Sequence, residues 1–70
     1  MTSKYRLGID IGGTFTDATL INEETGAVRI VKVPSTPSNP STGFINAALR
    51  VLEEADVAPS ELSYVVHGTR

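Results

Sequence analysis

The chain has 70 residues and no cysteine, which excludes disulfide bonds and metal sites built from thiolates. With 6 basic and 8 acidic residues its net charge is -2, so it lacks the basic surface of a nucleic-acid-binding domain. Its apolar runs are shorter than a signal peptide or a membrane span requires, so we expect a cytoplasmic protein without a membrane partner.

Three strands are predicted in the first half of the chain, at residues 5–11, 15–22 and 27–34. The first alternates apolar and polar residues, which is the period of a half-buried strand. Gly12 and Gly13 interrupt that pattern, and Pro34 stops the third strand. Because the connections are short, the three strands are expected to form an antiparallel meander.

A loop rich in proline and serine then leads to a predicted helix. We assign Ser35 to Thr42 to loop chemistry, with Asn39 or Ser41 as the helix cap and Pro40 in the first turn. The helix is predicted from Phe44 to Glu54. Its expected apolar face repeats at spacings of three and four residues and comprises Ile45, Ala48, Leu49 and Leu52.

A fourth strand is predicted at residues 62–68, "LSYVVHG", where it would pair in parallel with the first strand after the helical crossover. The predicted order is therefore β-β-β-α-β. This order predicts an α/β fold that resembles part of a ribonuclease-H-like lobe, the arrangement that opens actin-like ATPases and sugar kinases.

The stretch "GIDIGGTFTD" at residues 8–17 carries the predicted chemistry. Glycines in a tight hairpin allow backbone amides to approach an anion, since a Cβ atom would block it and restrict φ. Thr14 and Thr16 add hydroxyl donors that suit phosphate. Asp10, at the end of the first strand, is placed to hold Mg²⁺ through water molecules.

Two other kinds of phosphate loop do not fit this stretch. A Walker A loop needs a lysine that is missing here, and a dinucleotide fingerprint needs G-x-G-x-x-G at the start of a helix. The alternative that this stretch has a purely structural role also stays open. Paired glycines between two strands are often only a hairpin turn, and an aspartate near a turn often only caps it.

Together, "GIDIGGTFTD" and the later "VVHGT" resemble the amino-terminal domain of the hydantoinase A/5-oxoprolinase family, within the actin-like ATPase superfamily. Sugar kinases of the glucokinase type are similar through "DIGGT" only. The resemblance covers essentially all 70 residues but only the opening part of such a protein. We therefore expect residues 1–70 to be an amino-terminal fragment that is inactive alone.

The resemblance implies roles for individual residues. Asp10 would be a catalytic residue that lies at the Mg²⁺ ion of ATP. The stretch from Gly12 to Thr16 would wrap the phosphates; it contains Gly12, Gly13, Thr14, Phe15 and Thr16. The family's "HGT" turn near the active cleft implies a catalytic role for His67, and possible roles for Asp17, Gly68 and Thr69 are left open.

The resemblance further implies an ATP-dependent amidohydrolase that opens a cyclic amide such as a hydantoin or 5-oxoproline, usually together with a B-type subunit or domain. Three alternatives stay open. The parent protein could be a sugar or small-acid kinase of the same superfamily, an ATP-dependent ketone carboxylase subunit, or a non-catalytic regulator that senses a nucleotide or a sugar.

Overall fold

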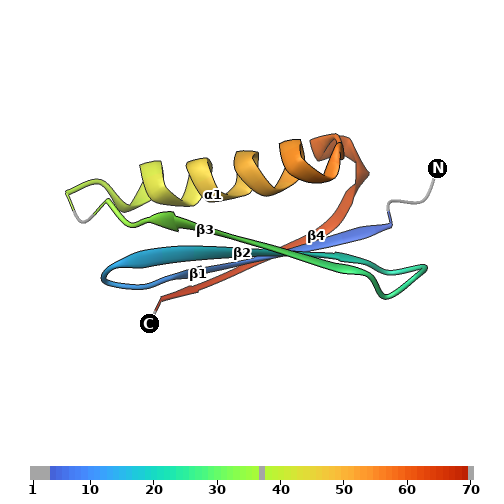
Figure 1. Ribbon diagram of the computed structural model, residues 1–70, viewed down its shortest axis with the longest axis horizontal. Helices are drawn as coiled ribbons and strands as arrows, with labels where there is room; N and C mark the ends of the chain where they lie inside the picture. Colours follow the sequence, from blue (N-terminus) through green and yellow to red (C-terminus); the bar gives the residue numbers. More distant parts are fainter. Residues whose placement is uncertain (1–3, 37, 70) are drawn as a thin grey trace.

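The computed structural model describes residues 4–36 and 38–69, without the side chains of Pro40, Tyr64, His67 and Thr69. It contains one four-stranded sheet with one long helix lying along one face (Figure 1). The elements are β1 (Tyr5–Ile11), β2 (Phe15–Asn22), β3 (Val28–Pro34), α1 (Pro40–Ala55), the short 3-10 helix η1 (Pro59–Glu61) and β4 (Leu62–Thr69). No helix in the described ranges is long and apolar enough to cross a membrane.

The strand order in the sheet is β3-β2-β1-β4. Short turns join β1 to β2 and β2 to β3, and both pairs are antiparallel. The longer α1 crossover returns the chain to the other side of β1, where β4 pairs in parallel. The predicted α/β class, the β-β-β-α-β order, the meander and the parallel fourth strand are all confirmed.

The core lies between α1 and the sheet face beneath it. Strand side chains alternate between faces, and the buried helix-facing set is apolar except for Thr16. The buried apolar residues are Leu7, Ile9, Ala18, Leu20, Val31 and Val33 from the sheet and Ala47, Val51, Leu52 and Val57 from α1 and the segment after it. The expected apolar face of the helix is wrong in part, because Ile45 and Leu49 are 52% and 57% exposed.

The helix begins at Pro40, four residues before the predicted start, because the loop closes onto its first turn. Asn39 is the N-cap, as one of the two predicted alternatives, but its side chain makes no capping hydrogen bond. Thr36 takes that role from outside the helix, since its Oγ1 accepts a hydrogen bond from the Gly43 amide at 3.0 Å. The first turn of α1 is therefore tied to the end of β3.

Candidate functional site

The candidate site lies on the sheet face opposite α1, at the end where the β1–β2 loop turns. Asp10 of β1 pairs with Asp17 of β2 and, on its other side, with Gly68 of β4. Asp17 in turn pairs with Lys32 of β3. These residues alternate with the buried, helix-facing ones, so Gly68, Asp10, Asp17 and Lys32 form one row across the uncovered face.

Charge in this row is mixed. The Lys32 Nζ lies 3.6 Å from Asp17 Oδ1 and 5.5 Å from the centre of the Phe15 ring. Asp10 and Asp17 are directly opposite each other, an arrangement in which like charges are unfavourable without a cation. The row therefore combines two neighbouring carboxylates with one lysine.

The donor set suits magnesium better than zinc or calcium. Across the described residues there is no group of three or more His, Cys, Asp or Glu side chains that could hold a metal. Mg²⁺ keeps several waters and is usually bound by one or two carboxylates plus phosphate oxygens. The neighbouring carboxylates of Asp10 and Asp17 match that donor set.

The β1–β2 loop is the second part of the site. Its turn is closed by a hydrogen bond from the Gly12 amide to the Phe15 carbonyl oxygen at 2.9 Å. In the described part of the chain, the loop's other backbone hydrogen bonds use the Gly12 and Thr14 carbonyl groups and leave the Gly13 and Thr14 amides unused. Gly13 and Thr14 are exposed, so these amides are available to an anion.

The glycines around Asp10 leave open space. A Cβ atom added at Gly8, Gly13 or Gly68 would have no neighbouring atom within 4 Å. Among the described glycines only Gly26 has a positive φ, 80°, so φ alone does not require glycine in the β1–β2 loop. What remains is the steric reason: the backbone beside Asp10 is bare, which is the form that close approach of a ligand requires.

Thr16 is placed differently from Thr14. Its side chain is 0% exposed and lies on the helix-facing side, where Oγ1 is 3.0 Å from the Ser35 Oγ. Thr14 is exposed in the loop. The two hydroxyl groups predicted to act together are thus on different sides of the backbone, and only Thr14 lies on the exposed surface of the loop.

The "HGT" segment was expected to be a turn, but it is the end of β4 and joins the site through its backbone pairing with β1. Gly68 pairs with Asp10, while His67 and Thr69 pair with Ile9 and Ile11. The side chains of His67 and Thr69 lie outside the described residues, so their predicted roles stay predictions.

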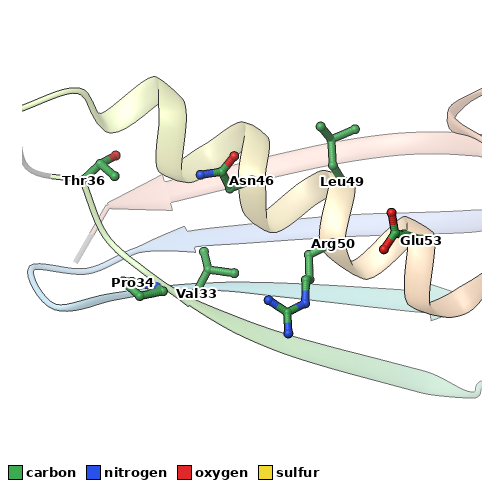
Figure 2. A pocket seen from close by; sticks show the side chains of 7 residues that line it. All are labelled: Val33, Pro34, Thr36, Asn46, Leu49, Arg50 and Glu53. Carbon is green, nitrogen blue, oxygen red and sulfur yellow. The ribbon is translucent and has the colours of Figure 1, made fainter.

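A groove of about 510 Å³ lies elsewhere, between α1 and the outer edge of β3 (Figure 2). It is lined by Val33, Pro34, Thr36, Asn46, Leu49, Arg50 and Glu53. None of the residues predicted for the site lines this groove, and it opens on the side of the sheet that carries the helix. The residues predicted from the sequence are therefore not part of this groove.

Two residues at the site were missed from the sequence. Lys32 was predicted only as a residue of the third strand. The "EETG" turn sets the register of β2 and β3, and this register places Lys32 opposite Asp17. Ser35 was assigned to loop chemistry because it follows Pro34 in a run of prolines and hydroxyl residues. No local pattern marks Ser35, since its partners lie more than 15 residues away in the chain.

The profile of the hydantoinase/oxoprolinase N-terminal region matches residues 6–70, which include every residue of the site described above. The chain belongs to the hydantoinase/oxoprolinase family. The predicted resemblance is thereby confirmed.

Two relatives of this hydantoinase/oxoprolinase region are similar over most of its length. An uncharacterised protein of Methanocaldococcus jannaschii is 42% identical over 69 residues, which are 99% of this chain and 10% of the relative. The alpha subunit of caprolactamase from Pseudomonas jessenii is 39% identical over 59 residues, which are 84% of this chain and 8% of that protein. The chain therefore spans a tenth or less of these relatives.

Proposed function

We propose that this chain is the phosphate-binding part of an ATP-dependent amidohydrolase that opens a cyclic amide. One observation carries the proposal: an exposed loop with unused amides stands beside two carboxylates and three glycines that leave the backbone bare. This combination suits a polyphosphate with its magnesium ion. Membership of the hydantoinase/oxoprolinase family supports it.

In this proposal each group has a defined task. The amides of Gly13 and Thr14 and the Thr14 hydroxyl donate hydrogen bonds to phosphate oxygens. Asp10, with Asp17 beside it, would hold Mg²⁺, which neutralises phosphate charge when bound. Lys32 balances the paired carboxylates. Because the site is built to position and neutralise charge, its main contribution is electrostatic.

The substrate class is inferred from chemistry and from the family. A lactam resists attack by water, and phosphorylation of its amide oxygen makes the carbonyl carbon a better electrophile. The name of the Pseudomonas jessenii relative refers to caprolactam, a cyclic amide, and to an alpha subunit. We therefore propose a cyclic amide as substrate and a second, B-type subunit as partner.

The deciding experiment measures phosphate release from Mg·ATP by the full-length polypeptide, expressed with and without its second subunit. The added substrates are 5-oxoproline, hydantoin, caprolactam, acetone with bicarbonate, and glucose. Release stimulated by a cyclic amide is the expected result. Stimulation by glucose alone would favour the kinase, stimulation by acetone with bicarbonate the carboxylase, and nucleotide binding without turnover the regulator.

Asp10→Asn tests the metal ligand. We expect kcat to fall at least about 100-fold, as for loss of a group that stabilises transition-state charge, and the Mg²⁺ needed for half-maximal rate to rise. Asp56→Asn is the matched control with the same loss of charge. Asp56 ends α1 with φ 57°, a conformation that asparagine tolerates, so its activity should equal that of the wild type. Equal rates for Asp10→Asn and wild type would remove Asp10 from the site.

A further inference from the structure

We propose that Ser35 is a positioning residue that holds the β1–β2 loop in the form that binds phosphate. The inference rests on the proposed function for its ligand, but its geometric part concerns the chain alone. Ser35 follows β3 and belongs to neither strand of the hairpin that forms the loop. It nevertheless contacts that hairpin at three atoms.

Two of these contacts hold the loop's carbonyl groups. The Ser35 hydroxyl donates a hydrogen bond to the Gly12 carbonyl oxygen at 2.6 Å. The Ser35 amide donates to the Thr14 carbonyl oxygen at 2.8 Å. One residue therefore holds the carbonyl groups on both sides of Gly13.

The third contact fixes Ser35 itself. A serine hydroxyl has one proton, and that of Ser35 is used toward Gly12. At the 3.0 Å contact between the two hydroxyls, Thr16 must therefore be the donor and Ser35 the acceptor. Because Thr16 is 0% exposed, water does not compete for this bond. The buried Thr16 thus acts through Ser35, which accounts for its inward placement.

The next residue ties this arrangement to the helix. Thr36 accepts a hydrogen bond from the Gly43 amide at 3.0 Å and donates one to the Asn39 carbonyl oxygen at 2.5 Å. The Ser35–Thr36 pair therefore joins the loop to the first turn of α1. The hydrogen bonds of Ser35 to the loop and those of Thr36 to the helix start are connected by the peptide bond between these two residues.

Peptide geometry explains how these contacts orient the Gly13 amide. In a trans peptide the carbonyl and amide groups point in opposite directions, and the described chain contains no cis peptide. Holding the Gly12 carbonyl oxygen on Ser35 therefore points the Gly13 amide away from Ser35. The Gly13 amide is thus oriented before a ligand binds. This orientation raises affinity, because the loop loses less conformational freedom on binding.

The test compares Ser35→Ala, Ser35→Thr and Ser63→Ala in the full-length protein. Ser63 is a matched control, because its hydroxyl also has two oxygen partners, the Tyr5 carbonyl and Glu23 Oε1, at the other end of the sheet. Hydrogen–deuterium exchange on ligand-free protein reports the order of residues 8–17. Calorimetry with Mg·ATP reports affinity.

In Ser35→Ala we expect exchange at the loop to be at least about tenfold faster and the Kd for Mg·ATP about tenfold higher. Ser35→Thr should restore both, because it keeps the hydroxyl. Ser63→Ala should change neither. Loop exchange in Ser35→Ala equal to that of the wild type, or raised equally in Ser63→Ala, would overturn the inference. Failure of the wild type to bind Mg·ATP would instead overturn the proposed function, and the exchange data would still decide the role of Ser35.

Discussion

Two glycines show how differently the same residue is used at the scale of single side chains. At Gly43 a Cβ atom would lie 3.3 Å from the Thr36 Oγ1 and 3.4 Å from the Thr16 Oγ1. Both hydroxyl groups are held by hydrogen bonds, so moving either group would weaken those hydrogen bonds. At Gly13 a Cβ atom would meet nothing within 4 Å. Gly43 therefore serves packing, whereas Gly13 borders open space, which the proposed function assigns to a ligand.

Alanine substitutions should separate these two uses. Gly43→Ala gains helix propensity but overpacks the helix start, and we expect a net loss of about 1 kcal/mol of unfolding free energy. Gly13→Ala should leave stability unchanged or raise it by about 0.5 kcal/mol, since φ there is permissive. It should nevertheless weaken Mg·ATP binding. Thermal unfolding and calorimetry measure the two effects, and unchanged affinity in Gly13→Ala would argue against a ligand at the loop.

At the residue scale, the sequence predicted only the site residues that lie together in one short motif. Asp10 and the loop residues are neighbours in sequence, so "GIDIGGTFTD" could indicate them together. The inward turn of Thr16 was not predictable, because it depends on Ser35 approaching from the end of β3. Lys32 likewise joins the site only through strand register.

At the scale of elements, α1 shows the limit of periodicity. The helix carries two apolar stripes: the buried residues Ala47 and Val51 define one, and the exposed residues Ile45 and Leu49 define the other. Both stripes satisfy the spacing of an amphipathic helix. Only the stripe with Ala47 and Val51 packs on the sheet, and Thr36 ties the start of the helix to the segment after β3.

Two leucines on this helix provide a matched test. Leu52 is 6% exposed and Leu49 is 57% exposed. Leu52→Ala removes buried methyl groups and leaves a cavity, so we expect a loss of about 2–4 kcal/mol of unfolding free energy. Leu49→Ala should change it by less than about 0.5 kcal/mol. Chemical denaturation measures both, and equal losses would contradict the assigned helix face.

At the scale of the whole molecule, polar contacts join three distant segments at the end of the sheet opposite the loop. Glu23, after β2, accepts hydrogen bonds from the Ser63 hydroxyl at 2.8 Å and from Arg6 Nη2 at 3.0 Å. Ser63 belongs to the start of β4 and Arg6 to β1. Glu23 therefore links the antiparallel meander to the parallel strand.

These contacts predict a dependence of stability on pH. The hydrogen bond from Ser63 and then that from Arg6 hold the pKa of Glu23 below its usual 4.5, because both favour the charged carboxylate. A lowered folded-state pKa stabilises the fold above pH 4.5, and this contribution is lost as the pH falls through the folded-state value. Glu23→Gln should therefore lower the melting temperature slightly at pH 7.

The melting-temperature difference between Glu23→Gln and wild type should shrink toward pH 3. Because Glu23 is exposed, the effect should also be small in 1 M salt. In a Ser63→Ala background, which lacks the hydroxyl group that bonds Glu23, the melting-temperature difference caused by Glu23→Gln at pH 7 should be smaller. The same difference at both pH values would show that Glu23 acts through its shape and not through its charge.

The sequence by itself determined the strands, the helix, their order and the family, because hydrophobic period, turn residues and the "GIDIGGTFTD" and "VVHGT" motifs are local. The tertiary structure decided which stripe of α1 is buried, that Thr16 faces inward, and that Lys32 and Ser35 meet the site. The physical reason is distance along the chain. These features depend on strand register and on contacts between segments, which only the packed fold brings together.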